Sequence, residues 1–182
     1  MTSSPCSADD VIDFWRQAGP ERWFSKDNAF DADFRARFLT AHEAAASGAL
    51  GGWAATAQGA LALLILLDQF PRNAFRGTAR MFATDPQARD IADAAIAQGL
   101  DQAVEAALRR FIYLPFMHSE RLVDQQRSVA LNEALAPDTS YYAKLHLDII
   151  ERFGRFPHRN ALLGRTTTPA EQQFLDEGGF QG

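Results

Sequence analysis

The sequence predicts an all-α protein built from antiparallel helix pairs. Alanine, the best helix former, occurs 32 times among 182 residues, whereas the β-branched residues Val and Ile together occur 11 times. Apolar residues recur at spacings of three and four, which is the period of an amphipathic helix. No segment combines strand-like alternation with hairpin turns. No linker divides the chain, so we expect one domain, residues 1–182, with residues 1–6 mobile.

Start and stop signals place the first two helices. Ser7 followed by Asp10 is typical of a capping box, and Gly19 with the proline behind it ends the apolar stripe that follows. A second amphipathic helix is expected from about Phe30 to Gly48, because an apolar stripe recurs there at spacings of three and four: Phe30, Phe34, Phe38, Ala41 and Ala45.

The most apolar segment is expected to form a buried helix from about Thr56 to Phe70. It is apolar on every side, so other helices must surround it. Its uninterrupted apolar stretch, 59–67, ends at Asp68, well short of the ~20 residues that a bilayer requires. We therefore predict no membrane-spanning segment. Four leucines at its centre should be almost completely buried: Leu63, Leu64, Leu66 and Leu67.

The second half of the chain continues the helical pattern. Further helices are expected at 85–99, 104–115, 119–136, 142–154 and from 168 onward, which makes roughly seven main helices. Asp85 is expected to be an N-cap with Pro86 as the first helical residue. Pro115 is expected to stop the helix that precedes it. Thr168 and Glu171 have the spacing of a capping box.

Charge and cysteine content exclude several classes of protein. With 18 basic and 23 acidic residues the net charge is −5, which argues against nucleic acid as a partner because phosphate neutralisation needs a basic surface. The single cysteine, Cys6, cannot form a disulfide within the chain. The first residues lack the basic region and apolar run of a signal peptide, so we expect a cytoplasmic protein.

Three polar segments interrupt the helical pattern, at 68–77, 114–120 and 152–160. The first and third share a motif, because Phe70-Pro71-Arg72-Asn73 is echoed by Phe156-Pro157-His158-Arg159-Asn160. Residues 152–165 carry four arginines and no acidic residue, which is a local excess of cations in an acidic protein. Because guanidinium groups bind carboxylates and phosphates through paired hydrogen bonds, these segments predict a pocket for a small anion.

The candidate ligand-binding residues share a charge or hydrogen-bonding capacity: Asp68, Arg72, Asn73, Arg76, His118, Glu120, Asp124, Arg155, His158, Arg159 and Asn160. In this hypothesis Arg72, Arg155 and Arg159 clamp the anion, and the two asparagines orient it. His118 and His158 donate or shuttle protons. We expect four of these residues to lie in one pocket: Arg72, His118, Arg155 and His158.

A structural interpretation competes with the anion site. Arginines in such turns also satisfy carbonyls at helix ends and pair with carboxylates such as Asp68 or Asp124, which ties helices together. Histidines 42 and 146 fit satisfied core positions, and no two histidines have the spacing of a helical zinc pair. We expect neither a metal ion nor a cofactor. Phosphate loops and the Gly-x-Ser-x-Gly motif are also absent, so the sequence assigns no reaction.

The polar segments resemble those of the uncharacterised bacterial family called domain of unknown function 924. The resemblance rests on residues 68–77, 115–120 and 153–165, together with 11–15, 23–24 and 124–128, and it spans nearly the whole chain. It implies an all-α fold similar to tetratricopeptide repeats and no established activity. Met117 departs from the family pattern, in which a polar residue such as Glu is expected at this position.

The sequence therefore favours a soluble helical protein that binds a small anionic molecule or an acidic peptide end in a pocket lined by Arg, His and Asn. The alternative is a protein-interaction scaffold of tetratricopeptide type, which would present a concave helical surface to a protein segment. A hydrolytic or metal-dependent enzyme ranks third. No membrane partner is expected, and the oligomeric state stays open.

Overall fold

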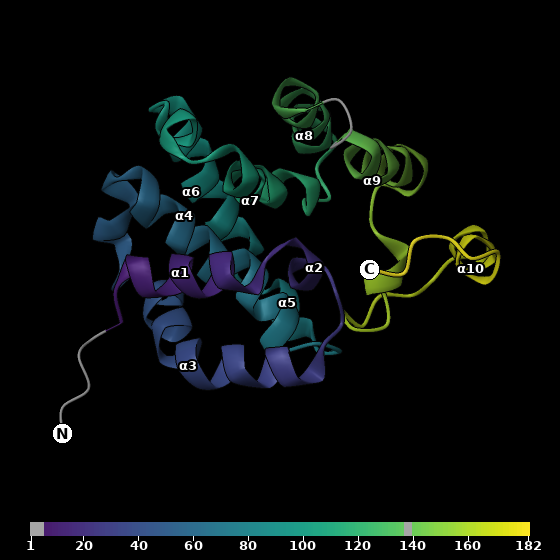
Figure 1. Cartoon of the computed structure of the whole chain (residues 1–182). Coiled ribbons are helices and arrows are strands. Elements are labelled where there is room, and N and C mark those ends of the chain that lie inside the picture. The colour runs from purple at the N-terminus through teal and green to yellow at the C-terminus, as the bar shows by residue number, and fades with distance from the viewer. Residues whose placement is uncertain (1–5, 137–139) are drawn as a thin grey trace. The chain divides into compact units, whose positions relative to one another are not determined.

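The structure, a computed structural model, describes residues 6–136 and 140–182. All regular elements in these two ranges are helical, which confirms the predicted all-α class (Figure 1). No helix among the described residues is both long and apolar enough to cross a membrane. Residues 1–5 of the segment expected to be mobile lie outside the described part. In chain order the elements are α1 (Ala8–Ala18), α2 (Pro20–Trp23), α3 (Asn28–Ala46), η1 (Gly51–Ala55), α4 (Ala57–Leu64), η2 (Ile65–Gln69), α5 (Phe70–Ala74), η3 (Ala79–Phe82), α6 (Asp85–Ala97), η4 (Leu100–Ala103), α7 (Ala106–Met117), α8 (Leu122–Leu135), α9 (Ser140–Phe153), η6 (Pro157–Arg159) and α10 (Pro169–Asp176).

The chain divides into two compact units. Unit 1 runs up to Arg76 and also contains Arg80–Pro115, so it holds α1 to α6 and most of α7. Unit 2 contains Gly77–Ala79 and the chain from Phe116 onward, so it holds α8, α9, η6 and α10. Each unit has an apolar core of its own residues.

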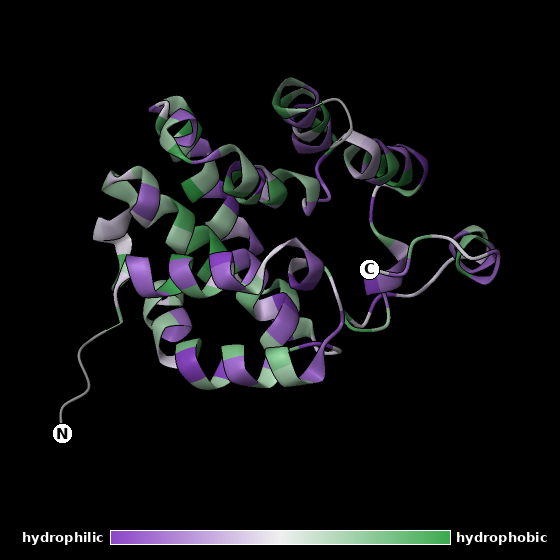
Figure 2. Ribbon diagram, viewed as in Figure 1, coloured by the Kyte–Doolittle hydropathy of each residue, from purple (hydrophilic) through white to green (hydrophobic). Residues whose placement is uncertain are grey.

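The core of unit 1 is built around α4 and the turn η2 that follows it. Helices α1 and α6 pack on α4, and Figure 2 shows α4 as one of the most hydrophobic parts of the ribbon. Trp15 of α1 adds aromatic contacts, with ring centroids 5.4 Å from Phe34 and 5.3 Å from Phe111. The four leucines predicted to be buried are at most 1% exposed, which confirms the predicted core: Leu63, Leu64, Leu66 and Leu67.

The buried helix continues beyond its expected end, through the π-helical turn η2 and past Pro71 into α5. Pro71 has no backbone N–H, so it cannot donate a hydrogen bond to a carbonyl of the preceding turn. Two side chains supply the missing donors. His42 Nδ1 donates to the Leu66 carbonyl at 2.8 Å, and Thr84 Oγ1 donates to the Leu67 carbonyl at 2.5 Å. The helix can therefore pass a proline without leaving buried carbonyls unpaired, and His42 is the satisfied core histidine that was expected.

Both predicted capping boxes are present. The Ser7 backbone N–H donates to Asp10 at 2.8 Å, and the Ser7 hydroxyl accepts from the Asp10 N–H. At the start of α10, the Thr168 N–H donates to Glu171 Oε2 at 2.7 Å, and the Thr168 hydroxyl accepts in return. These two helix starts were readable because the motif is local in sequence.

The expectation that Asp85 caps a helix is wrong. Thr84 is the residue before α6, and Asp85 is the first helical residue. The Asp85 carboxylate accepts two hydrogen bonds from Arg72, at 2.9 and 3.0 Å. Asp85, a residue type that favours the N-cap position, instead forms an ion pair with Arg72 of α5.

The expected stop at Pro115 is also wrong, because α7 continues to Met117. A proline inside a helix removes one hydrogen bond from the preceding turn. Leu114 and Phe116, on either side of it, are 7% and 0% exposed, and burial of two large side chains outweighs that loss.

In unit 2, α8 and α9 pack side by side, as expected for a helix pair (Figure 1). The apolar core consists of Ile149, Ile150 and Phe156, which are at most 4% exposed. Phe153 and Phe174 pack against this group, with ring centroids 5.2 Å apart. The core thus joins α9 to the polar turn after it and to α10.

Replacing Leu64 with alanine should lower the free energy of unfolding by about 2–5 kcal/mol, because the side chain is fully buried and would leave a cavity. Urea unfolding followed by far-ultraviolet circular dichroism measures the change. L122A is the matched control, since Leu122 is 45% exposed and should cost less than about 0.5 kcal/mol. Equal costs for the two variants would contradict the enclosed position of α4.

Candidate functional site

The first polar segment places Arg72 between two carboxylates of unit 1. Its Nη1 lies 3.1 Å from Asp68 and 2.9 Å from Asp85, and Nη2 lies 3.0 Å from the second oxygen of Asp85. The Asp68 side chain is completely buried and those of the other two residues are at most 16% exposed. This arrangement matches the structural interpretation, in which arginine ties helices together, because it joins η2 and α5 to the first turn of α6.

The local sequence explains why Asp68 faces inward. It lies in the π-helical turn η2, whose five residues are all buried. The neighbouring Gln69 donates to Asp68 Oδ2 at 2.6 Å, and Arg72 reaches back one turn to the other oxygen. A charge buried in this way is tolerated only when it is paired and hydrogen-bonded. Asp68 therefore holds the guanidinium of Arg72 in place.

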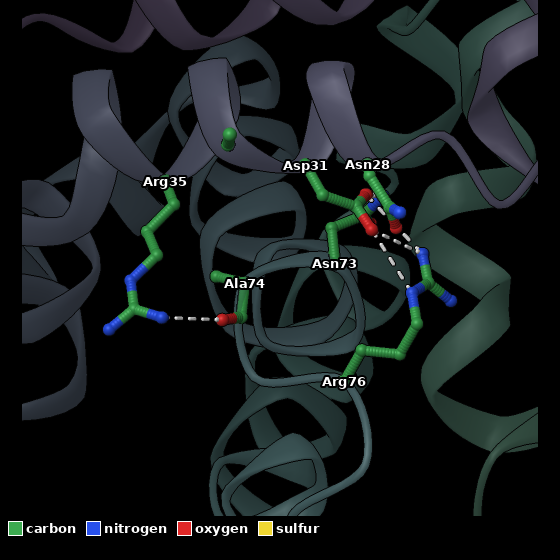
Figure 3. A pocket seen from close by; sticks show the side chains of 7 residues that line it. Asn28, Asp31, Arg35, Asn73, Ala74 and Arg76 are labelled. Carbon is green, nitrogen blue, oxygen red and sulfur yellow. Dashed lines mark hydrogen bonds and ion pairs between the residues drawn. The ribbon is translucent and has the colours of Figure 1, made fainter.

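Asn73 and Arg76, which follow Arg72 in the sequence, both donate hydrogen bonds to an aspartate of α3. Asn73 Nδ2 lies 2.7 Å from Asp31 Oδ1, and Arg76 Nε lies 3.0 Å from Asp31 Oδ2 (Figure 3). The Asp31 side chain is 12% exposed. Sequence reasoning missed Asp31, because an acidic residue in the first turn of a helix looks like an ordinary helix start.

A shallow hollow of about 290 Å³ adjoins these three residues in unit 1 (Figure 3). Arg35 of α3 extends along its other side and donates to the Ala74 carbonyl at 3.2 Å. The guanidinium of Arg35 also lies 5.6 Å from the Phe75 ring centre. The lining thus carries two cations and one carboxylate: Asn28, Asp31, Ala32, Arg35, Asn73, Ala74 and Arg76.

In unit 2 the second and third polar segments meet at Glu120. Its carboxylate accepts two hydrogen bonds from Arg165, at 2.7 and 3.0 Å, and a third from the Phe156 N–H at 2.8 Å. Burial by itself would raise the pKa of Glu120, but the hydrogen bonds from Arg165 and Phe156 hold it below its ordinary value. Glu120 is therefore a charged anchor for the turn that precedes η6.

A second ion pair joins that turn to α10. Arg155 donates to both oxygens of Glu171, at 2.6 and 2.9 Å, and Asn160 Nδ2 lies 3.3 Å from the same carboxylate. The hydrogen bond from Arg155 lowers the pKa of Glu171 to about 2. Asn160 is completely buried. Glu171 was noticed in the sequence only as half of a capping box.

The remaining candidates also belong to unit 2. Asp124 accepts from the Ser119 hydroxyl at 2.6 Å, and His118 is half-buried beside Ser119. The guanidinium of Arg159 lies 4.5 Å from the centre of the Phe156 ring. His158 is half-buried next to the same ring, with centroids 5.6 Å apart. Arg159 and His158 therefore lie beside Phe156, a core residue of the unit.

The structure brings three pairs of candidates together. Asp68 contacts Arg72 directly, Asn73 and Arg76 share Asp31, and Arg155 and Asn160 share Glu171. Arg72 belongs to unit 1, so the pocket that would join it to His118, Arg155 and His158 stays a prediction. Sequence reasoning did not assign the partners of these arginines and asparagines. Most of the partners are carboxylates that lie far from them in the sequence, so no local pattern indicates the pairing.

Replacing Glu171 with glutamine should lower stability at neutral pH, because the variant keeps a capping group but loses the charge paired with Arg155. The pKa of Glu171 is depressed to about 2 in the folded state, so its contribution is complete above the ordinary value of 4.5 and fades as pH falls toward 2. Urea unfolding at several pH values should show the two stability curves converging below pH 4.5. The exposed Glu177 provides the control E177Q, and parallel wild-type and E171Q curves would contradict the ion pair's role.

Comparisons with known proteins agree with this architecture. A solved structure of a protein of unknown function from Agrobacterium tumefaciens is 57% identical to the chain, with a TM-score of 0.92 and coverage of 94% of this chain and 97% of that one. No curated protein matches the chain. Residues 11–179 match the family described as "Bacterial protein of unknown function (DUF924)", which confirms the resemblance seen in the polar segments. The chain therefore belongs to this family of bacterial proteins of unknown function.

Proposed function

We propose that the protein binds a small anionic molecule in the hollow beside Asp31, between Arg35 and Arg76. The observation that carries this proposal is the charge of the lining, which has two guanidinium groups and a single carboxylate. That carboxylate already accepts from Asn73 and Arg76. A further anion would therefore meet a net positive lining with no unpaired carboxylate to repel it.

Both arginines keep donors for a ligand. A guanidinium has five N–H donors in a planar fork. Arg76 donates to Asp31 through Nε and Nη2, and Arg35 donates to Ala74 through Nη1. Among the hydrogen bonds of the described residues, the other nitrogens of these two side chains have no acceptor. A carboxylate or phosphate between them can accept paired hydrogen bonds from either side.

The size of the hollow limits the ligand. About 290 Å³ lies at the lower end of the range for small-molecule sites. Arg35 and Arg76 are exposed at its rim, so the site is open to solvent. A compact molecule with one anionic group suits this space, and the anionic end of a peptide would also fit. We place the clamp here because Arg35 and Arg76 line the same hollow, whereas Arg72 and Arg155 are not part of its lining.

A second candidate function is the docking of a protein segment on α9, as in a tetratricopeptide-type scaffold. It is favoured by Tyr141 and Tyr142, which are 67% and 59% exposed and contact each other edge to face at 5.2 Å. Aromatic side chains are enriched in the core of protein interfaces. Loss of a partner on replacing both tyrosines, with anion binding unchanged, would favour this alternative over the hollow.

Isothermal titration of the purified protein with inorganic phosphate, sulfate and acetate tests the anion site. We expect one of these probes to bind and R35A to weaken its binding at least about tenfold, because a charge-assisted pair of hydrogen bonds is lost. R37A is the matched control, since Arg37 lies on the same helix, is 60% exposed and pairs with Asp33. Absence of binding by all three probes, or equal affinities of R35A and R37A, would overturn the proposal.

A further inference from the structure

The rings of two histidines in unit 2 are enclosed by two phenylalanines. Phe180, near the end of the described chain, lies with its ring centroid 4.6 Å from His146 and 5.3 Å from His158. Phe156 contacts the same two imidazoles, at 5.3 and 5.6 Å. Figure 1 shows the C-terminal end of the chain beside the segment that leads from α9 into η6. The terminal segment thus covers an imidazole pair.

The covering segment is attached to α10 rather than to the elements that it covers. The chain reverses at Gly178, whose φ of +83° is natural only for glycine. Gly179 then crosses Phe174 so closely that a Cβ would lie 2.5 Å from the Phe174 carbonyl oxygen. The Gly179 N–H donates to that oxygen at 2.9 Å, and Gln181 Nε2 donates to the Leu175 carbonyl at 3.2 Å.

No hydrogen bond among the described residues joins Gly179–Gln181 to α9 or η6. The segment is held there by the Phe180 ring and by Gly182, which lies against the His158 ring. The position of α10 does not depend on these contacts. Arg155 pairs with Glu171, and Phe153 packs on Phe174. The segment can therefore lift while the rest of the unit keeps its fold, since local openings cost little where few contacts are made.

The surroundings of His158 disfavour a positive charge. Arg159 faces it from its own turn, Arg165 from the loop that follows, and His146 from α9. Glu120 is the acidic side chain among these groups and is itself bound to Arg165, and Gly182 of the covering segment lies against the imidazole. Burial, reinforced by Arg159, lowers the pKa of His158 to about 3. Its Nδ1 is buried without a hydrogen-bond partner. An imidazolium in this position would leave its Nδ1–H without an acceptor among the described residues.

We propose that residues 179–181 form a pH-sensitive strap, which is closed over His146 and His158 at neutral pH and released when His158 takes up a proton. Release would bring the His158 ring into contact with water, where an imidazolium is stable. It would also uncover the faces of His146 and Phe156 that Phe180 occupies, so the proton would expose an aromatic and cationic surface on unit 2.

The direction of the pH effect follows from proton linkage. The closed state holds His158 with a pKa of about 3, whereas the open state returns it toward the ordinary value of 6.5. The open state therefore binds more protons, so closure is complete above pH 6.5 and weakens as pH falls from there toward 3. Within this window each fall of one pH unit should raise the ratio of open to closed molecules by up to about tenfold.

Nuclear magnetic resonance of the full chain with labelled Phe and His side chains can follow the strap and the proton in one titration. We expect the Phe180 ring signals to shift between neutral pH and about pH 4, together with the titration of His158. The ring of Phe24, which is 59% exposed and lies in unit 1, serves as the internal control and should not follow that titration. Phe180 signals that stay constant while circular dichroism reports intact helices would overturn the proposal.

Two variants separate the switch from acid unfolding. F180A should raise the apparent pKa of His158 toward 6.5, because the imidazole then stays uncovered at every pH. H158Q should keep Phe180 in its closed position at pH values where the wild-type strap opens. Q173A, an exposed change on α10, is the matched control and should leave the titration of His158 unaltered. Release of the strap in H158Q at the same pH as in the wild type would contradict the assignment of His158 as the trigger.

Discussion

The missing N–H of Pro71, placed in the most buried helix of the chain, determines much of unit 1. A buried carbonyl without a donor costs about 1–3 kcal/mol, so the carbonyls that the proline cannot serve must find other partners. His42 and Thr84 provide them from two other parts of the chain. The wider π-helical turn that accompanies this solution sets Asp68 inside the core. In unit 1, α3, α5 and α6 all pack against this one turn.

Pairing with carboxylates accounts for most of the arginines in the polar segments. Arg72, Arg155 and Arg165 each donate two hydrogen bonds to one carboxylate, a geometry that lysine cannot reproduce. Removing one member of such a partly buried pair leaves the other charge uncompensated. These arginines therefore act first as ties between helices. Arg76 pairs with Asp31 in the same way, but it lines an exposed hollow together with Arg35, and the proposed anion site depends on the position of these two side chains.

Unit 2 depends on two glutamates in a similar way. Glu120 holds the backbone N–H of Phe156 and the side chain of Arg165, while Glu171 holds Arg155 and Asn160. Together they order a polar turn that contains four arginines between residues 152 and 165 but no acid of its own. This turn also positions Phe156 and His158 next to each other, with His158 against Phe180. A local excess of positive charge is thus balanced by distant carboxylates, and the imidazole next to it is kept neutral.

Local patterns were sufficient for the helical class, the buried leucines of α4 and η2, the two capping boxes and the family. Each depends on residues within one or two helical turns, where spacing and propensity report the physics directly. The partners of Arg72, Arg76 and Arg165 could not be predicted, because Asp85, Asp31 and Glu120 lie 13 or 45 residues away and pair only after the helices have packed. The continuation of the helix past Pro71 could not be predicted either. In the sequence a proline indicates the end of a helix, and the side chains that satisfy the buried carbonyls, His42 and Thr84, are brought there by packing. Long-range pairing of charges and buried carbonyls is a property of packed helices, so only the tertiary structure could reveal it.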